Sequence, residues 1–500
     1  MMATRASRPD GRCLLLNEDN SHFFSSRSKE EMTIEGLHRL IDHYVDQTQV
    51  KQLLLSPNSM CASFASEVLD PIWHDCADPD EAEKAGVLRW PANALRLHQR
   101  GIDPYAEWLS YSKERGISAW LSMRMNDVHN VDDPTSFMHS SFWKENPQFR
   151  RETERFDAWN DRAFDYGHPE VRDYHMTFIR ELFERYDFDG LELDWMRFGY
   201  HFRPGTEAEG APLLTAFMSE VRQLADDHAR RRGHRIEIGV RVPSRPWTAA
   251  GLGLDAIRWA REGFIDLLVV TPFWATLETE MPIEKWKELL GDHPVVLAAG
   301  LEVLIRPYPA ASAGFTNNAE TVRGAAASLL HRGADAIYLF NYMDSHTTPS
   351  SSEDYDRILQ EAGSLETITN HVRRHVVTYS DTWAPDETPT YALPVELRPA
   401  EPVSFAIHLG QKPTTGTAAV FIGMDAAASA SVADLEVRVN GQPCSSSQQS
   451  APEHLHPVVE CAAGFDVPNA AITAGHNMVE VSSGGPMSGQ IMWVEIRITP

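Results

Sequence analysis

Two carboxylates stand two residues apart in the apolar segment 190–194, at Glu192 and Asp194. Side chains of a β-strand alternate between its two faces, so both carboxylates share one face of the predicted strand. Inside a barrel such groups are costly unless they are paired or do chemistry. Asp194 lies nearer the carboxyl end of the strand, where barrel enzymes hold their active sites, and is the first candidate for catalysis. For the deeper Glu192, an ion pair with Arg241 is an equally good explanation.

A second catalytic carboxylate is expected at the end of another strand. Glu302 follows the apolar residues 298–301, and if it faces inward, so do Ala298 and Gly300, which leaves room above them. The alternative is that Glu302 is a loop residue bonded to the backbone or to Arg306. The next candidate is Asp127, which follows another predicted strand and has several polar neighbours.

Further polar and aromatic side chains follow the predicted strands and are expected to contact a substrate, together with Glu192 and Arg241. Aromatic rings stack on the C–H faces of sugars, although core packing is an equally good explanation for any one of them. His129 can donate to a sugar hydroxyl or can simply be an exposed or capping residue. The predicted contacts are Arg124, Asn126, His129, Arg197, Trp195, Trp274, Asn341 and Tyr342.

The elements that must position these residues form a repeating pattern. Eight short apolar runs alternate with stretches of helical periodicity such as 171–185 and 321–331. This pattern predicts an α/β protein, a closed (β/α)8 TIM barrel. An insertion over 126–167, rich in Trp, Phe, Asn and Asp, is expected to shape the cleft. The predicted strands are 13–16, 52–55, 118–122, 190–193, 236–242, 267–270, 295–299 and 336–340.

The composition changes after about residue 375, where Pro, Thr and Ser become frequent. Alternating apolar and polar residues follow in the segments 403–409, 435–439, 478–481 and 493–498. Such alternation between turn signals predicts a small antiparallel β-sandwich. We therefore expect a barrel domain over 10–375 and an accessory β-sandwich domain over 385–500.

The segment 167–197 carries a family resemblance. Gly167-His-Pro-Glu-Val-Arg-Asp-Tyr174 and the strand before Arg197 resemble "NPEVRDY" and "YDVDGIHFDxxR" in the glycosyl-hydrolase-like barrels of the family-ten-like group. The strand is also similar to "DGFRxD" of the alpha-amylase superfamily, whose nucleophilic Asp falls on Asp194. Glu192 replaces the arginine of that motif, so the chain is no ordinary amylase. The chitinase pattern "DGxDxDWE" aligns as well, but its catalytic Glu falls on Met196, which argues against chitinase activity.

The resemblance implies a glycoside hydrolase, which needs two carboxyl groups across the scissile bond. Asp194 is then the nucleophile or charge stabiliser, with Glu302, or failing that Asp127, as general acid/base. The arginines expected at the strand ends favour an anionic sugar, unless they pair with the acidic residues already named. Two alternatives are a non-catalytic glycan-binding barrel and a polysaccharide lyase, the latter with His129 as base beside Arg124.

Bulk composition excludes several other classes. A net charge of −26 over 500 residues argues against nucleic acid as a partner, and no apolar run approaches the ~18 residues of a membrane span. Five scattered cysteines without CxxC spacing predict free thiols and no zinc site, although Cys444 and Cys461 are close enough in sequence to pair. We expect no metal or organic cofactor, and the oligomeric state is not indicated. The first ten residues lack the apolar core of a signal peptide, which predicts a cytoplasmic protein or a secreted one without its leader.

Overall fold

The structure is a computed structural model. It describes residues 14–84, 86, 88–154, 156, 158–312, 315–344, 351–398, 401–428, 434–447, 451–452, 455–483 and 489–500. The predictions made for the first ten residues and for Cys13 lie outside this part of the chain.

Eight parallel strands close into a barrel in sequential order, each paired with its neighbour and β8 with β1. The predicted (β/α)8 barrel is thereby confirmed, and each of the eight apolar runs is one of its strands. The strands are β1 (Leu14–Glu18), β2 (Val50–Leu55), β3 (Ser118–Arg124), β4 (Gly190–Asp194), β5 (Glu237–Pro243), β6 (Leu267–Thr271), β7 (Val296–Glu302) and β8 (Ala336–Phe340).

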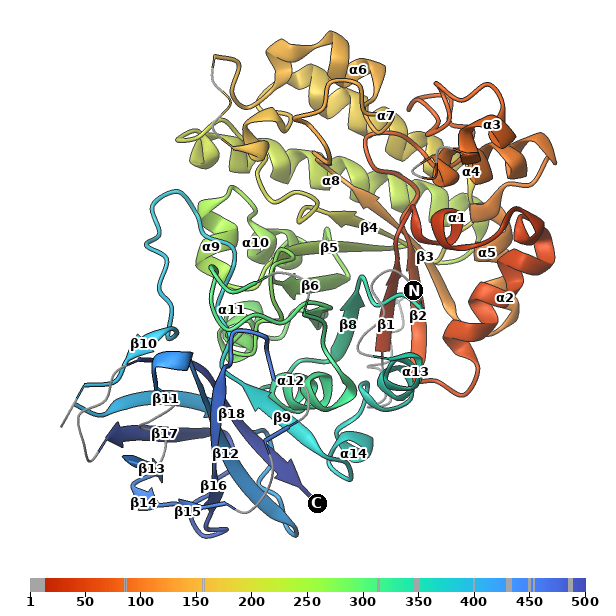
Figure 1. Ribbon diagram of the computed structural model, residues 1–500. Coiled ribbons are helices and arrows are strands. Elements are labelled where there is room, and N and C mark those ends of the chain that lie inside the picture. The colour runs from red at the N-terminus through yellow and green to blue at the C-terminus, as the bar shows by residue number, and fades with distance from the viewer. Residues whose placement is uncertain are drawn as a thin grey trace.

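Helices surround the barrel (Figure 1). The two stretches of helical periodicity are confirmed as α7 and α12. Pro169 is the first residue of α7, and Asn318 caps the start of α12. The helices are α1 (His22–Ser26), α2 (Ile34–Val45), α3 (Pro79–Lys84), α4 (Arg89–Gln99), α5 (Pro104–Glu114), α6 (Ser141–Glu145), α7 (Pro169–Arg185), α8 (Glu207–Arg232), α9 (Pro246–Gly251), α10 (Ala256–Arg261), α11 (Ile283–Leu290), α12 (Ala319–His331), α13 (Ser352–Glu361) and α14 (Leu365–Ile368).

The barrel interior is filled by side chains from alternate strand positions. Trp120 of β3 lies fully buried inside, among Leu15, Leu54 and Val269. Gly190 on the neighbouring β4 has no room for a side chain, because a Cβ atom there would overlap the Trp120 ring. The opposite faces of the strands, including Leu191 and Leu193, pack in the larger core between the barrel and its helices. Polar chemistry is therefore possible only above this packed floor.

The C-terminal part is a sandwich of two antiparallel sheets, as the alternation predicted. One sheet has the order β10-β18-β12-β16-β15, with β9 on β18, and the other has the order β11-β17-β13-β14. The strands are β9 (Arg373–Val376), β10 (Val395–Glu396), β11 (Val403–His408), β12 (Thr417–Met424), β13 (Leu435–Val439), β14 (Gln442–Pro443), β15 (Ser445–Ser446), β16 (Cys461–Val467), β17 (His476–Ser483) and β18 (Gln490–Thr499).

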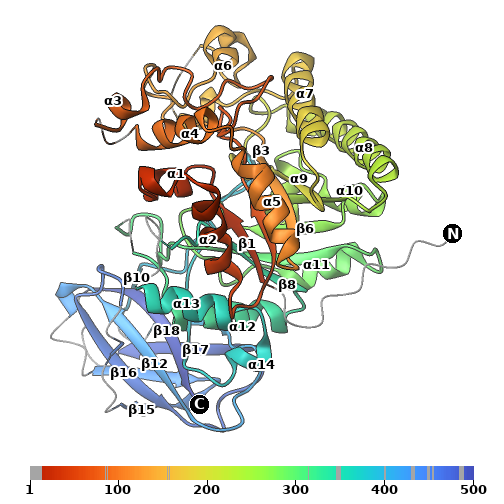
Figure 2. The same cartoon turned by 90° about the vertical axis from the view of Figure 1, so that its right-hand side faces the viewer.

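The sandwich is attached to the barrel beside α12, as Figures 1 and 2 both show. β9 packs on α12 and pairs with β18, so it belongs to the C-terminal sheet although it precedes residue 385. Its buried Arg374 pairs with the buried Glu495 of β18, with Nη2 and Oε2 2.6 Å apart. Gly324 of α12 is needed at this junction, because a Cβ atom there would overlap the carbonyl of Arg374.

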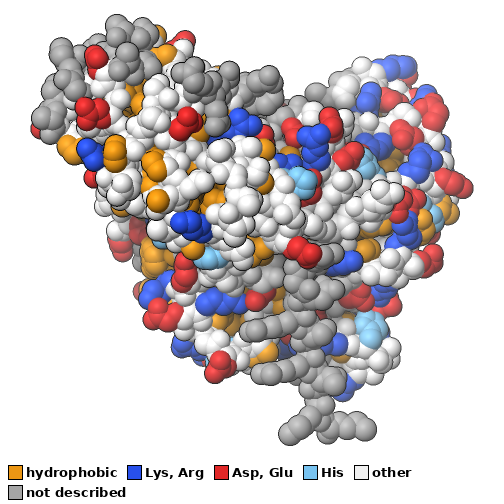
Figure 3. Space-filling model, turned by 90° about the horizontal axis from the view of Figure 1, so that it is seen from below, with side chains coloured by type: hydrophobic (Ala, Val, Ile, Leu, Met, Phe, Trp, Pro, Cys, Tyr) orange, Lys and Arg blue, Asp and Glu red, His pale blue; other side chains and the backbone are white. Residues whose placement is uncertain are grey.

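The surface mixes charges of both signs, and acidic and basic side chains are interspersed over the face shown in Figure 3. Cys61, Cys76, Cys444 and Cys461 are free thiols, as expected. Among the described helices, none combines the length and the apolar character needed to cross a bilayer.

Candidate active site

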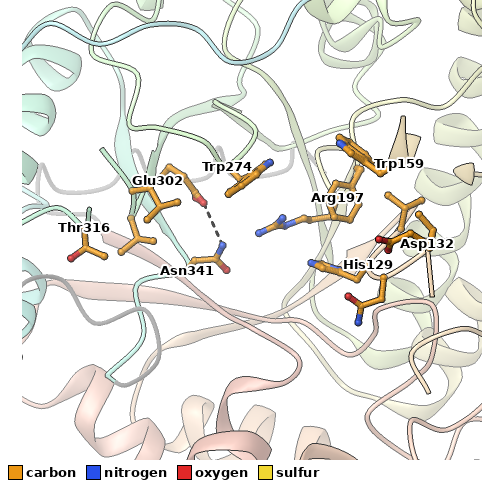
Figure 4. Close-up of a pocket in the computed structure, with 14 residues that line it drawn as sticks. His129, Asp132, Trp159, Arg197, Trp274, Glu302, Thr316 and Asn341 are labelled. Atoms are coloured by element: carbon orange, nitrogen blue, oxygen red, sulfur yellow. Dashed lines mark hydrogen bonds between the residues drawn. The ribbon is translucent and has the colours of Figure 1, made fainter. Parts of the chain in front are cut away.

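A pocket of about 610 Å³ opens over the barrel, beside the carboxyl ends of β7 and β8 (Figure 4). The insertion predicted over 126–167 contributes the segment 128–132 and Trp159 to its wall. The strand ends contribute Glu302 and Asn341, and the loop after β4 contributes Arg197. The lining residues are Val128, His129, Asn130, Val131, Asp132, Trp159, Arg197, Phe198, Trp274, Glu302, Val303, Leu304, Thr316 and Asn341.

Glu302 is the last residue of β7, and its carboxyl group faces the pocket. Only 2% of the residue is exposed. Oε1 accepts a hydrogen bond from Nδ2 of Asn341 at 3.3 Å, whereas the buried Oε2 has no partner among the described residues. The carboxyl group forms no ion pair with a described cation, although the charges of Arg197 and Arg241 favour its ionised form.

The pKa of Glu302 follows from this environment. Burial raises it from an ordinary 4.5 to about 8, although Arg197 and Arg241 lower it and Asp381 raises it further. At neutral pH the group therefore holds its proton and can donate it to a bound molecule, which is the property required of a general acid.

Asp194, at the end of β4, has the opposite environment. Both of its oxygens accept from Nη1 of Arg241, at 3.1 and 3.0 Å, and Oδ1 also accepts from the backbone N–H of Met196 at 2.9 Å. The pair forms because β4 and β5 are in register at these two residues. Arg241 is itself fully buried and lies 3.5 Å above the Phe340 ring centroid. Asp194 lies beneath the pocket, outside its immediate lining.

Glu192 faces the barrel interior one level below Asp194, as the alternation predicted, but its partners are not those considered. An ion pair with Arg241 was one of the two explanations considered, and it is wrong because Glu192 is in register with Ser122 and Gly239, whereas Arg241 is in register with Asp194. Glu192 accepts instead from the hydroxyls of Ser122 at 2.6 Å and Tyr338 at 2.9 Å. Burial, followed by the charge of Asp194, raises its pKa to about 7.

Asp127 belongs to a cluster of charges at the end of β3. Its carboxylate accepts from Arg124 at 3.2 Å, and the ring Nδ1 of His129 lies 2.9 and 3.0 Å from its two oxygens. Arg124 also pairs with Asp19, which follows β1 and was not singled out from the sequence. Interactions with His129 and Arg124 outweigh the effect of burial and hold the pKa of Asp127 below its ordinary value. Asp127 is therefore ionised, and it orients His129, which lines the pocket.

Six predicted contact residues lie outside the pocket lining: Arg124, Glu192 and Arg241, described above, and Asn126, Tyr342 and Trp195. Asn126 uses its amide to fasten the insertion, donating to the carbonyls of Phe164 and Tyr200 at 2.9 Å. Tyr342 is fully buried, and its hydroxyl donates to the carbonyl of Glu302 at 3.0 Å. Trp195 is also fully buried, on the helix-facing side of β4 that alternation assigns to it.

Aromatic side chains form one wall of the pocket. Trp274, in the loop after β6, is 41% exposed and lines the pocket as predicted. Trp159 stacks on Phe273 at a centroid distance of 5.4 Å and an interplanar angle of 16°, and Phe198 contacts both rings. Such exposed ring faces suit the C–H faces of a sugar.

The loop that carries Trp274 is held by a residue from the connection between barrel and sandwich. Asp381 accepts hydrogen bonds from three consecutive backbone N–H groups, those of Phe273, Trp274 and Ala275, at 2.8, 2.9 and 2.7 Å. No local pattern around Asp381 indicates this role, because its partners lie more than a hundred residues earlier in the sequence.

Arg197 extends into the pocket from the loop after β4 (Figure 4). Its guanidinium stacks over the rings of Phe340 and Phe198, with centroid distances of 4.7 and 5.4 Å. Burial and the neighbouring Arg124 lower its pKa to about 10, so it remains a cation at neutral pH. Within the described part of the chain, no three His, Cys, Asp or Glu side chains are grouped so as to hold a metal ion.

No protein-family model and no curated protein matches the chain. Solved structures of similar shape include a cycloisomaltooligosaccharide glucanotransferase from Paenibacillus sp. (TM-score 0.34, 10% identity, 98% of this chain, 57% of that chain). They also include alpha-L-fucosidase isoenzyme 2 from Paenibacillus thiaminolyticus (0.42, 14%, 70% and 48%) and the PgaB glycoside hydrolase domain from Bordetella bronchiseptica (0.41, 12%, 71% and 99%). The chain spans about half the length of the first two proteins. TM-scores this low carry nothing over to this chain.

Proposed function

We propose that this protein is a glycoside hydrolase in which Glu302 is the general acid and Asp194 is the nucleophile or charge stabiliser. The observation that carries the proposal is the environment of Glu302. A carboxyl group with a raised pKa faces a pocket with an aromatic wall, and a second carboxylate, paired with an arginine, stands at the end of β4. Glycosidic bond cleavage usually requires two carboxyl groups, one of which donates a proton.

In the first step Glu302 donates its proton to the glycosidic oxygen as the C–O bond to the anomeric carbon breaks. The electron pair of that bond goes to the leaving oxygen, and positive charge develops on the sugar ring. The negative charge of Asp194 stabilises this ring as nucleophile or as counter-charge, and Arg241 fixes the direction of the carboxylate. The deprotonated Glu302 then takes a proton from the water that completes hydrolysis.

A screen of oligosaccharides with product sizing tests the proposal. We expect hydrolysis of at least one glycan by the wild-type protein, with turnover reduced by orders of magnitude in Glu302→Gln and in Asp194→Asn. Glu278→Gln is the matched control. Glu278 is likewise buried with a pKa of about 7, but it bonds Ser244 outside the pocket lining. Binding of a glycan without turnover, or equal turnover in Glu302→Gln, would contradict the proposal in favour of a glycan-binding barrel.

A polysaccharide lyase is the second candidate, because one observation favours it. The ring Nδ1 of His129 lies 2.9 Å from Oδ1 of Asp127, so Nε2 is the ring atom that can take up a proton at the pocket edge, on the same side as Arg197. A lyase removes a proton beside a carboxylate that a cation has neutralised. Its product is an unsaturated sugar that absorbs in the ultraviolet, so absorbance without uptake of water identifies this reaction. His129→Gln would then abolish activity and Glu302→Gln would not.

A further inference from the structure

We infer that the pocket recognises an acidic sugar, and that Arg197 binds the carboxylate of that sugar. This inference rests on the proposed function for the identity of the ligand as a carbohydrate. It assigns Arg197 as the residue that distinguishes uronic-acid units from neutral ones.

The arginines at this end of the barrel differ in whether they form an ion pair with a carboxylate of the protein. Arg124 pairs with Asp19 and Asp127, and Arg241 pairs with Asp194. Arg197 is different. It is 7% exposed, its Nε has no partner, and it forms no ion pair with a described carboxylate. An unpaired cation this deeply buried is costly unless something else compensates it.

The charges that face Arg197 leave room for an external anion. Asp194 forms its ion pair with Arg241, and Asp19 and Asp127 form theirs with Arg124. Glu302 lies across the pocket, and burial raises its pKa to about 8, so it is largely neutral at pH 7. Asp132 is the other carboxylate in the lining, and its side chain is exposed at the rim.

The chemistry of the guanidinium selects the kind of anion. It is planar and presents paired N–H donors that match the two oxygens of a carboxylate. Its stacking on Phe340 and Phe198 restricts the plane in which it can donate. A sugar that stacks on Trp274 and receives a proton from Glu302 would place a ring carboxylate within reach of the opposite wall, where Arg197 lies.

Binding measurements test the inference separately from catalysis. Isothermal titration in a Glu302→Gln background, where no substrate is consumed, compares tetrasaccharides of galacturonic and glucuronic acid with their neutral counterparts. We expect one of the acidic sugars to bind at least about tenfold more tightly than its neutral counterpart, as a charge-assisted hydrogen bond provides. The preference should weaken at high salt and disappear in Arg197→Gln, while Arg197→Lys retains part of it.

Arg258→Gln is the control variant, because Arg258 is an exposed arginine paired with Glu262 on α10. It should leave the preference unchanged, and thermal melts establish that the Arg197 variants fold. Equal or tighter binding of neutral sugars, tighter binding of a sulfated galactan tetrasaccharide, binding of none of these sugars, or a preference that survives in Arg197→Gln would overturn the inference.

Assays of the wild-type protein distinguish failure of the inference from failure of the proposed function. Acidic sugars that bind through Arg197 but are never cleaved would contradict hydrolysis and leave the inference intact. Neutral glycans that Arg197→Gln hydrolyses at the same rate as wild type would contradict the inference and leave the proposed function intact.

Discussion

The ends of β4 and β7 carry two buried carboxyl groups that have very different hydrogen-bond and ion-pair partners. Asp194 has an arginine on both oxygens and a backbone N–H on one of them. Glu302 has one amide contact and an oxygen without a partner among the described residues. Both are almost completely buried, so the difference comes from their partners. Burial alone favours the protonated acid, and a paired cation reverses that preference.

The strand register of the barrel explains why the two carboxyl groups have different partners. Register decides the outcome at β4, because Arg241 stands level with Asp194 on the adjacent strand. At β7 the neighbour in register with Glu302 is Phe340, which offers no charge. Four substitutions test this difference, and their expected effects decrease from Asp194→Asn to Trp274→Ala.

Asp194→Asn should have the largest effect. It removes the negative charge of the site and leaves Arg241 buried without a counter-charge. We expect turnover to fall by at least about 10⁴-fold. The free energy of unfolding should fall by about 3–5 kcal/mol, the cost of breaking a buried ion pair. Enzyme assays and denaturant unfolding measure the two effects, and a variant of unchanged stability would show that the ion pair contributes little.

Glu302→Gln should reduce turnover by about 10²–10⁴-fold, the usual contribution of a general acid. Unlike Asp194→Asn, it should change the pH dependence of stability. The folded protein holds the Glu302 proton more tightly than the unfolded chain does. The resulting stabilisation is complete below pH about 4.5 and is lost as pH rises to about 8. The variant has no such dependence, so its stability relative to wild type should rise by a few kcal/mol, in order of magnitude, across this window. Parallel pH–stability curves would contradict the assignment.

Asp381→Asn should act on both the pocket wall and the acid. The loop that carries Trp274 loses part of its anchor, so KM should rise about tenfold, as expected for a lost charged hydrogen bond. Because the charge of Asp381 raises the pKa of Glu302, the basic limb of the kcat/KM profile should also move to lower pH. A change in KM alone would mean that Asp381 only holds the loop.

Trp274→Ala should have the smallest effect. Loss of an exposed ring removes stacking on the sugar, for which we expect KM to rise about fivefold with little change in kcat. The pH profile should be unchanged, because the ring carries no charge. A shifted basic limb in this variant would mean that Trp274 maintains the burial of Glu302.

Much of this arrangement could be predicted from local patterns. The eight apolar runs predicted the closed barrel, and alternation along 190–194 predicted that Glu192 and Asp194 face the interior. The same alternation places Trp195 with Leu191 and Leu193 on the helix-facing side, which agrees with core packing, the alternative given for each aromatic residue. The insertion over 126–167 was correctly expected to border the pocket.

Pairing between strands could not be predicted in the same way. Arg241 pairs with Asp194 and not with Glu192 because of the register of β4 against β5, and closure of the whole barrel sets that register. Asp19 reaches Arg124, and Asp381 reaches the loop after β6, only after distant segments have come together. The raised pKa of Glu302 likewise depends on the absence of a nearby ion-pair partner among the described residues, which no sequence spacing reports.

The central claim is that Glu302 holds a proton at neutral pH, and carbon-13 NMR with label at the glutamate side-chain carboxyl carbon tests it most directly. The account predicts one resonance that titrates near pH 8, absent in Glu302→Gln and present in Glu278→Gln. Glutamates that all titrate below pH about 6, or a resonance near pH 8 that persists in Glu302→Gln, would contradict it.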